Sequence, residues 1–470
     1  MINIKKIFAN IKKRWNAFAG YYEFLRIAIP LIISTGAWAF QSFVNRFFLA
    51  WYSNNAYAAS LPAGLLECSI MDIFIGTIAY INVFVAQYNG KKKYKAIGPS
   101  LWQTVHIAFL SSIIMLAVAF FSDKIFNFIG HPQDIIVEEI KYFKILCYGA
   151  FPYLASTALS GFYAGRGKTK TILVINIVGI IVNIIFDYLL IFGYFGFHEL
   201  GIVGAAIATI IGATVVLILF LSSITSKNNN KTYNTRKIKP DLKFIKYFLK
   251  YAFPNGMSWF LDMSVFTFFV LTIGTLGKIE LSATNVAFNI YSFAYMAIVG
   301  CAMTTSILVG NYIGKNKFYI AQTVVKTALH ITYTYISLMV VSFLFIPNIL
   351  IYPFSKGSES LIIEQIRPIA ITLLRYTAIF AFFESSGIIF SSAIKGGGDT
   401  KFAMKLLIAL FIITALTIYL AVFIFKVGLY QCWSILIAYD IILMISFYLR
   451  YKTNKWKHMC IIEIKIVDNK

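Results

Sequence analysis

Ser226–Lys243, SKNNNKTYNTRKIKPDLK, is the one long polar stretch in a chain of 470 residues. The chain as a whole is apolar: 59% of its residues are hydrophobic, 13% are charged, and the mean hydropathy is +0.76. This composition excludes an ordinary water-soluble globular protein and predicts an integral membrane protein. Because the polar stretch falls near the middle of the chain, it divides the apolar part into two halves.

Each half contains six long apolar stretches. An α-helix rises 1.5 Å per residue and the hydrocarbon core of a bilayer is about 30 Å thick, so roughly 20 apolar residues cross it. The twelve stretches cover approximately residues 27–51, 58–88, 100–122, 137–163, 171–195, 201–225, 246–276, 281–312, 320–346, 361–392, 402–426 and 428–450. The sequence therefore predicts an all-α integral membrane protein with twelve transmembrane helices in two pseudo-symmetric six-helix lobes.

Lysine and arginine gather in alternate connections between these stretches. The basic connections are the N-terminal tail, Lys91–Lys93, the turn at 165–170, the polar stretch itself, Lys315 with Lys317, residues 395–405 and the C-terminal tail. Because basic loops stay on the cytoplasmic side, both termini are predicted to be cytoplasmic. This orientation also explains the formal net charge of +23, so no nucleic-acid partner is expected.

The predicted organisation has five parts. They are a cytoplasmic amphipathic tail at 1–23, an N-lobe at 24–225, a basic cytoplasmic linker at 226–245, a C-lobe at 246–451 and a cytoplasmic tail at 452–470. The first segment mixes basic and apolar residues, and either lies at the membrane interface or is only a basic tail.

The two halves resemble each other. An ungapped alignment that pairs Pro30 with Pro254 also pairs glycines and basic residues at helix ends, and GRGKTK at 165–170 aligns with GGGDTK at 396–401. GRGKTK lacks the glycine spacing of a phosphate-binding loop, so both copies are interpreted as tight turns. Since six helices return the chain to its starting side, the repeat is parallel, as in transporters that alternate access between two lobes.

Ionisable side chains inside a transmembrane helix are costly, so each is a candidate for function. The candidates are five carboxylates and one arginine: Glu67, Asp72, Asp187, Asp262, Glu384 and Arg46. The similar depth of Arg46, Glu67 and Asp187 suggests that Arg46 forms an ion pair with one of the two acids.

Three of the acids lie beside other polar residues. Asn176, Asn183 and Asp187 form one polar stripe on an apolar helix, which either holds a cation or proton or joins helices by hydrogen bonds. In the second half, Asp262 lies one turn beyond Ser258, and Glu384 precedes two serines.

Several fragments, taken in order, resemble the multidrug and toxic compound extrusion (MATE) family over nearly the whole chain. They are PLIISTGAWAFQSFVNRFFLAW at 30–51, FVAQYNGKKK at 84–93, GRGKTK at 165–170, NIIFDYLLIFG at 183–193, GIVGAAIAT at 201–209, VGNYIGKNK at 309–317 and SSAIKGGGDTK at 391–401. The resemblance implies a secondary-active exporter in which efflux of an organic, cationic or amphipathic solute is driven by inward Na⁺ or H⁺.

The resemblance also implies roles for particular residues. Asp187 matches the acid of the N-lobe cation site, with Asn183 and Thr209 as polar partners and Na⁺ as a candidate ligand of Asp187 and Asn183. Asp262 and Glu384 match the acids of the C-lobe. Asn45 stands where the family commonly has another acid, which leaves the coupling ion open between Na⁺ and H⁺. The substrate-path candidates are Glu67, Asp72, Arg46, Gln41, Asn176 and Ser258.

Other functions are weighed against this one. A flippase for lipid-linked oligosaccharides or cell-wall precursors would favour a cationic cavity, and Arg46 keeps this alternative open. An ion channel fits the parallel repeat less well. No nucleophile, metal cluster or acid–base pair supports an enzyme, and no cofactor is expected beyond the coupling ion. We expect a monomer in the plasma membrane that binds a small-molecule substrate and the lipid bilayer.

Overall fold

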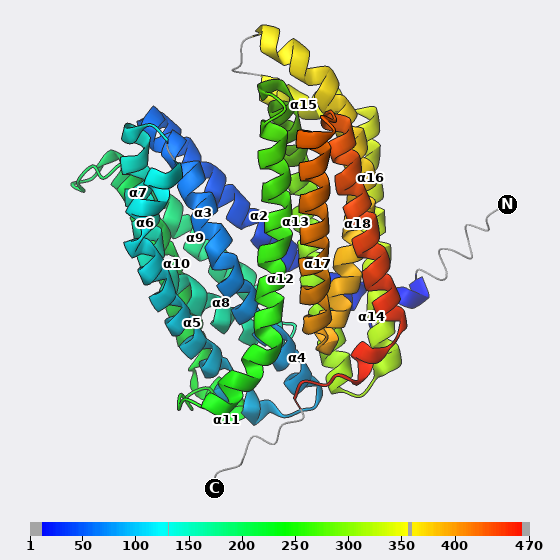
Figure 1. Ribbon diagram of the computed structural model, residues 1–470. Coiled ribbons are helices and arrows are strands. Elements are labelled where there is room, and N and C mark those ends of the chain that lie inside the picture. The colour runs from blue at the N-terminus through cyan, green and yellow to red at the C-terminus, as the bar shows by residue number, and fades with distance from the viewer. Residues whose placement is uncertain (1–11, 130, 356–359, 463–470) are drawn as a thin grey trace, which may run out of the picture. The chain divides into compact units, whose positions relative to one another are not determined.

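The computed structural model describes residues 12–129, 131–355 and 360–462 (Figure 1). Throughout these ranges the regular structure is helical and there is no β-strand. Eleven helical segments are long and apolar enough to cross a membrane, and a helix pair bent by 43° brings the number to twelve. The prediction of an all-α protein with twelve membrane spans is confirmed.

The first six spans are built from nine helical elements. They are α2 (Tyr21–Tyr52), α3 (Asn54–Ala79) with α4 (Ile81–Gly90), the 3₁₀ turn η1 (Tyr94–Ala96) with α5 (Ile97–Phe120), α7 (Gln133–Tyr148) with α8 (Ala150–Ala164), α9 (Thr169–Phe192) and α10 (Ile202–Ile224). Gly149 is the bend between α7 and α8, and its lack of a side chain leaves room for Ile210 of α10.

The second six spans are mostly single long helices. They are α12 (Leu242–Gly274), α13 (Lys278–Gly314), α14 (Phe318–Phe345), α16 (Ser360–Gly397), α17 (Thr400–Tyr419) with the π-helical turn η2 (Leu420–Ile424), and α18 (Leu429–Lys452). The short helices α6 (Ser122–Ile129), α11 (Lys227–Tyr233), α15 (Pro347–Ser355) and η3 (Lys455–His458) lie outside the spans.

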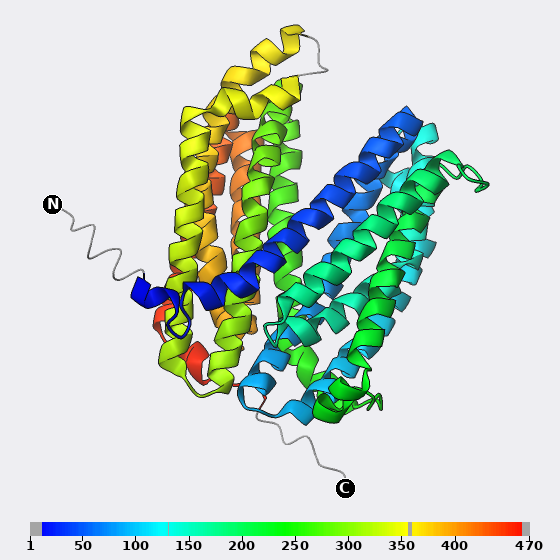
Figure 2. The ribbon, with the colours of Figure 1, turned by 180° about the vertical axis from the view of Figure 1, so that it is seen from behind.

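The described residues form two compact units. Unit 1 contains the residues up to Ile32 together with Leu261–Cys460, and unit 2 contains Ile33–Phe260 together with Ile461 and Ile462. The boundaries therefore lie inside α2 and α12, which begin in one unit and end in the other. Figure 2 shows that α2 is continuous through this boundary. The lobe limits expected from the sequence, 24–225 and 246–451, take the linker as their divide and stay a prediction.

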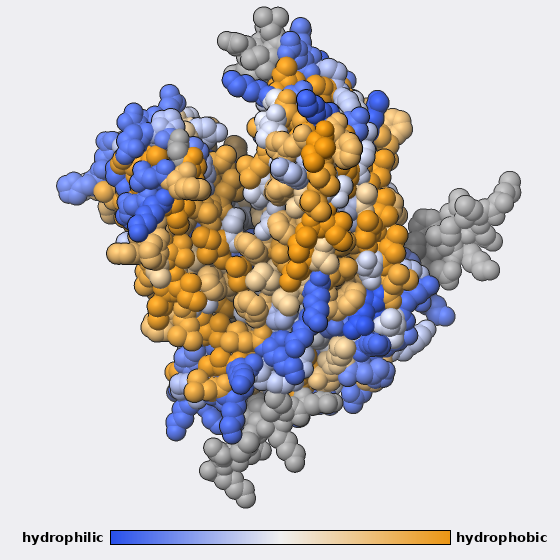
Figure 3. All heavy atoms as spheres, in the orientation of Figure 1, coloured by the Kyte–Doolittle hydropathy of each residue, from blue (hydrophilic) through white to orange (hydrophobic). Residues whose placement is uncertain are grey.

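Each unit exposes apolar side chains along the middle of its helices. On α5 the exposed residues include Phe109, Leu110, Ile113 and Ile114, and on α17 they include Ile412. In Figure 3 the hydrophobic colour covers the flanks of each unit and the hydrophilic colour gathers at the helix ends. A soluble protein rarely exposes so much contiguous apolar surface, so these faces are suited to lipid contact.

The two aligned glycine stretches are tight turns, as predicted. Gly167 lies between α8 and α9 with φ +72°, and Gly398 lies between α16 and α17 with φ +118°. Glycine adopts these angles readily because it has no Cβ. The Arg166 guanidinium lies 3.6 Å from the Phe162 ring centroid and 4.6 Å from that of Tyr233, so these aromatic rings account for its position.

The basic linker belongs to unit 2 and is hydrogen-bonded to α5. Trp102 Nε1 donates to the Thr235 carbonyl at 2.6 Å, and Gln103 Nε2 donates to the Lys239 carbonyl at 2.9 Å. Gln103 Oε1 also accepts from the Asp241 backbone N–H at 2.8 Å. These bonds tie the linker to the start of α5.

Only part of the predicted amphipathic tail can be compared, because residues 1–11 lie outside the described ranges. Trp15 and Phe18 are exposed, and an Arg14 guanidinium nitrogen is 3.1 Å from His330 Nδ1 in α14. This arrangement leaves the two aromatic rings available for the membrane interface while the basic residue contacts unit 1. Cys68, Cys147, Cys301 and Cys432 are free thiols.

Within unit 2, α3 crosses the first part of α12 at two glycines. A Cβ built on Gly76 would lie 2.8 Å from the Gly256 Cα, and Asn255 Nδ2 donates to the Gly76 carbonyl at 2.7 Å. We expect Gly256→Ala to destabilise the protein by about 1–3 kcal/mol, since the two backbones must separate. Thermal unfolding of the purified protein in detergent measures the change.

Gly64→Ala is the matched control for this crossing. Gly64 lies on α3, the helix that also carries Gly76, and a Cβ added there would meet only Tyr142, at 3.9 Å. An equal loss of stability in both variants would contradict a specific close approach at Gly256.

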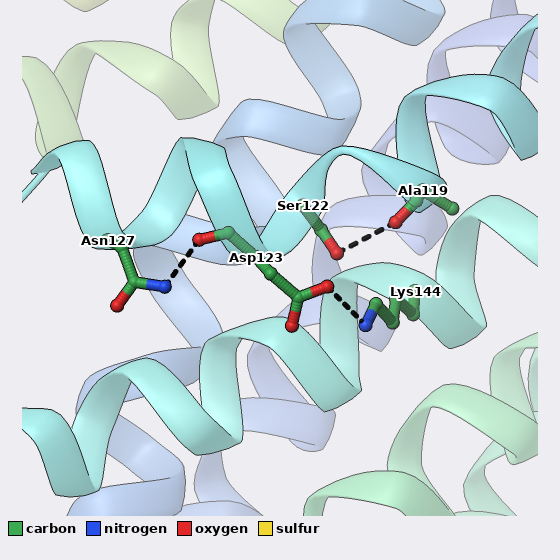
Figure 4. Close-up of polar contacts among 5 residues, drawn as sticks. All are labelled: Ala119, Ser122, Asp123, Asn127 and Lys144. Carbon is green, nitrogen blue, oxygen red and sulfur yellow. Dashed lines mark hydrogen bonds and ion pairs between the residues drawn. The ribbon is translucent and has the colours of Figure 1, made fainter.

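The clearest surface ion pair joins α6 to α7 (Figure 4). Lys144 Nζ donates to Asp123 Oδ2 at 2.7 Å, and Asn127 Nδ2 donates to the Asp123 carbonyl at 2.7 Å. The hydrogen bond from Lys144 lowers the pKa of the Asp123 carboxyl below its ordinary value.

A lowered carboxyl pKa stabilises the fold above the unfolded-state pKa, and this contribution is lost as the pH falls through the folded-state pKa. Because the Asp123 side chain is 56% exposed, solvent screening limits the contribution to less than about 1 kcal/mol. We expect Asp123→Asn to lower the melting temperature slightly near neutral pH and not at acidic pH. A difference that persists into the acidic range would contradict this assignment.

Candidate functional site

The first candidate site is the polar stripe of α9 in unit 2. Asp187 and Asn183 are both 0% exposed, at successive turns of the helix. Neither oxygen of the Asp187 carboxylate has a hydrogen-bond partner, and neither polar atom of the Asn183 amide has one. Buried polar groups are nearly always hydrogen-bonded, so this pair is suited to a further ligand or to a proton on the carboxylate.

The second part of α2 runs parallel to α9 and places Asn45 beside this pair. Asn176 Nδ2 donates to Ser34 Oγ at 2.7 Å, across a separation of 142 positions in the chain. Further along, the Phe48 ring lies 5.9 Å from Tyr188 and 6.1 Å from Phe192.

The same separation puts Asn45 level with Asp187, and Gln41 level with Asn183. Asn45 is 7% exposed, and its Oδ1 atom also has no partner. Two buried amides therefore accompany one buried carboxylate. Asn176, by contrast, uses its amide to join α9 to α2.

Helix α10 packs antiparallel against α9. Gly212 packs against Asn183, and Gly204 packs against the backbone of Leu190. Thr209 lies between these two contacts and so near the level of Asp187. Its hydroxyl donates to the Ala205 carbonyl at 3.0 Å, which leaves the oxygen able to accept.

Tyr142 of α7 brings further charged residues into the same region of unit 2. Its phenol interacts electrostatically with Asp187, Glu67 and Arg46. Glu67 and Asp72 are half-buried on α3, and Arg46 is exposed on α2. Arg46 forms no ion pair within 4.0 Å among the described residues, so the predicted pairing with Glu67 or Asp187 is absent from this structure. Consecutive residues of an α-helix point about 100° apart, so Asn45 occupies the buried face of α2 while Arg46 occupies the adjoining exposed face.

The second candidate site lies in unit 1 around Glu384. The Tyr291 hydroxyl of α13 donates a hydrogen bond to Glu384 Oε2. The two serines that follow Glu384 do not bond to it: Ser385 and Ser386 both donate to the Phe382 carbonyl, at 3.0 Å and 2.7 Å. Sequence reasoning missed Tyr291 because a contact between two helices leaves no local signal.

Asp262 interacts electrostatically with Glu384 and with Lys395, both on α16. Its side chain is exposed, whereas Lys395 is only 9% exposed. Ser258, one turn earlier on α12, belongs to unit 2, and its hydroxyl donates to the Pro254 carbonyl at 2.8 Å. The predicted association of Ser258 with Asp262 is thus limited to their shared helix.

Asp440 and Arg375 lie within spans and are missing from the sequence-based candidates. Asp440 lies near the middle of α18 and is 3% exposed, and Arg375 is exposed on α16. The rule that selected the other acids applies equally to Asp440, which is the only carboxylate in its helix.

No group of three or more His, Cys, Asp or Glu side chains with metal-binding geometry occurs in the described ranges. A Na⁺ ion at Asp187 would therefore rely on one carboxylate and on the amide oxygens of Asn183 and Asn45. Oxygen ligands of this kind suit a hard cation, and the Na⁺ assignment stays a prediction.

Comparison with known families identifies the family of this chain. The MatE family profile matches residues 30–189 and 254–420, which together make up more than half of the chain. The two matched segments begin at Pro30 and Pro254, the pair that aligned the two halves.

Curated relatives extend the match. A probable multidrug resistance protein NorM from Bacillus cereus is 27% identical over 394 residues, covering 81% of this chain and 84% of the relative. A protein of the same name from Bacillus anthracis is 28% identical over 337 residues, covering 70% of this chain and 72% of the relative.

Solved structures share the fold. A MOP superfamily transporter from Pyrococcus furiosus, reported with a binding pocket of reversed polarity, superposes with a TM-score of 0.81 at 20% identity, covering 93% of this chain and 96% of that one. The eukaryotic MATE transporter AtDTX14 superposes with a TM-score of 0.83 at 18% identity, covering 93% and 97%. The chain belongs to the MatE family and is a multi-span membrane transporter of small molecules, in the family of MATE multidrug efflux proteins.

Proposed function

We propose that this protein exports an organic solute across the plasma membrane, as a monomer, in exchange for inward Na⁺ or H⁺. The solute is cationic or amphipathic, and the two lobes alternate access to it. The proposal is supported by the family, by the NorM relatives and by the parallel repeat of six helices.

The observation that carries the proposal is the state of Asp187. A fully buried carboxylate without a hydrogen bond is unfavourable as a bare anion, because burial removes its hydration. Protonation or a bound cation removes this penalty, and entry of water would restore hydration. Asp187 is thereby suited to take up a proton or Na⁺ in one state of the transporter and release it in another.

The composition of this site limits how strongly it can hold Na⁺. Because the residue level with Asp187 on α2 is the neutral Asn45, the site has a single full negative charge, on Asp187. Asn183 and Thr209 add only neutral oxygens. A proton needs only the carboxylate, whereas Na⁺ needs several oxygens at once. Transport driven by an imposed pH gradient or by an imposed sodium gradient in proteoliposomes distinguishes the two ions.

A second candidate function is a flippase for anionic lipid-linked precursors. It is favoured by Arg46 and Arg375, which lie within the spans and are exposed. Asp187 and Asp440 are buried carboxylates within the spans, whereas both arginines are exposed, and for this reason we favour the cationic substrate.

The first prediction concerns coupling. We expect Asp187→Asn to reduce ion-driven uptake of a cationic dye into inverted vesicles by about tenfold or more, because the amide cannot exchange a proton and binds cations weakly. Glu384→Gln is expected to act in the same direction. Asp123→Asn, a carboxylate outside the spans, serves as the control. Unchanged uptake in both Asp187→Asn and Glu384→Gln would overturn the assignment of coupling to these acids.

The second prediction separates the two candidate functions. Replacing Arg46 and Arg375 together by glutamine is expected to leave uptake of the cationic dye within about a factor of two, because a cationic substrate is attracted by carboxylates and not by arginines. A flippase would instead lose translocation of a fluorescent polyprenyl phosphate in the same vesicles. Wild-type translocation of that lipid, abolished in the double variant, would favour the flippase.

A further inference from the structure

Asp440 is a buried carboxylate that the proposed function has not used. It lies about 17 Å from the start of α18, near the midpoint of the helix, at a rise of 1.5 Å per residue. Its side chain is 3% exposed, and its Oδ2 atom has no hydrogen-bond partner. A buried polar oxygen in this state is suited to a proton, a water molecule or a ligand.

The packing of α18 on α16 places Asp440 level with Glu384. The two helices run parallel: Tyr376 lies 6.0 Å from Tyr430, Gly387 packs against the Met444 backbone, and Phe390 lies 5.3 Å from Tyr448. The register at Gly387 puts Asp440 opposite Phe383, one residue before Glu384. Asp440 and Glu384 also interact electrostatically.

The titratable groups around Asp440 lie on α12, α13, α16 and α18 itself. The acid of α16 is Glu384, which accepts a hydrogen bond from Tyr291 of α13. Asp262 of α12 interacts electrostatically with both Glu384 and Asp440. Lys395 of α16 interacts electrostatically with Asp262.

The remaining titratable neighbours carry no positive charge at this level. They are Tyr439, which precedes Asp440 on α18, and Tyr295 of α13, which interacts electrostatically with Tyr439. The charged residues of α17 are Lys401 and Lys405, in its first two turns. Among the described residues, the ion pairs within 4.0 Å include neither Asp440 nor Glu384, and two neighbouring carboxylates without a cationic partner tend to retain a proton.

We propose that Asp440 and Glu384 together bind one exchangeable proton inside unit 1. The proton adds to one carboxylate, and the pair then carries a single negative charge; its release restores two negative charges. Tyr291 orients Glu384 through its hydrogen bond. The inference rests on the proposed antiport, for which Asp440 is an additional proton-binding residue.

Infrared spectroscopy of the protein reconstituted in lipid vesicles tests the site directly. On acidification, wild type is expected to gain the C=O stretch of a protonated, buried carboxyl group. Because one proton is shared, Asp440→Asn and Glu384→Gln should each displace or abolish the same band, whereas Asp123→Asn should retain it. Asp440→Glu should keep a displaced band, and it replaces Asp440→Asn if that variant does not fold.

Two infrared results would overturn the proposal. One is a band that is unchanged in Asp440→Asn, or unchanged in Asp440→Glu where only that variant folds. The other is a band that loses one independent component in each single variant, since the two acids would then bind separate protons.

Transport in the same vesicles provides the second measurement, with tetraphenylphosphonium as the probe. Asp440→Asn should lose about tenfold or more of the pH-driven uptake and retain exchange of the probe in the absence of a gradient. Loss of both activities in folded protein would make Asp440 a structural or substrate-binding residue and overturn the proposal. If wild type transports no probe, the proposed export fails, while the infrared result still decides whether the two acids share a proton.

Discussion

Hydrocarbon offers the polypeptide backbone no hydrogen-bond partner, and the rest of this structure follows from that constraint. A helix pairs its backbone groups within one segment, and the described spans accordingly contain helices and no strand. Close packing between helices then depends on small residues, as where Gly76 meets Gly256. The same constraint makes each polar side chain in a span costly, so the few that occur identify the candidate sites.

The two units meet this cost in different ways. In unit 2 one buried carboxylate, Asp187, lies with the amides of Asn183 and Asn45, which bring no charge of their own. In unit 1 several acids interact: Glu384 accepts from Tyr291, Asp440 lies level with it, and Asp262 acts on both. The first arrangement suits a single proton or cation on one acid, whereas the second suits a proton shared between neighbouring acids. A repeat in sequence has therefore diverged in its polar chemistry while retaining its helices.

Residues that act through their own helix were predictable from the sequence. The stripe formed by Asn183 and Asp187 follows from helical periodicity, and the turns at Gly167 and Gly398 follow from the aligned glycines. Residues that act across helices were not. Arg46 was expected to neutralise an acid, yet it lies on the exposed face next to buried Asn45. Tyr291 carried no local signal, because only packing brings its hydroxyl to Glu384.

The sequence by itself determined the membrane class, the number of spans and most of the intramembrane acids, because hydropathy and helical rise are local properties of a chain. Asp440 could also have been predicted, because it is a carboxylate within an apolar stretch. The tertiary structure decided which helices face one another and in what register, which puts Asn45 level with Asp187 and Asp440 level with Glu384. It also divides α2 and α12 between two units. Register depends on side chains of both partners in each helix pair, and a single sequence does not state which helices are partners.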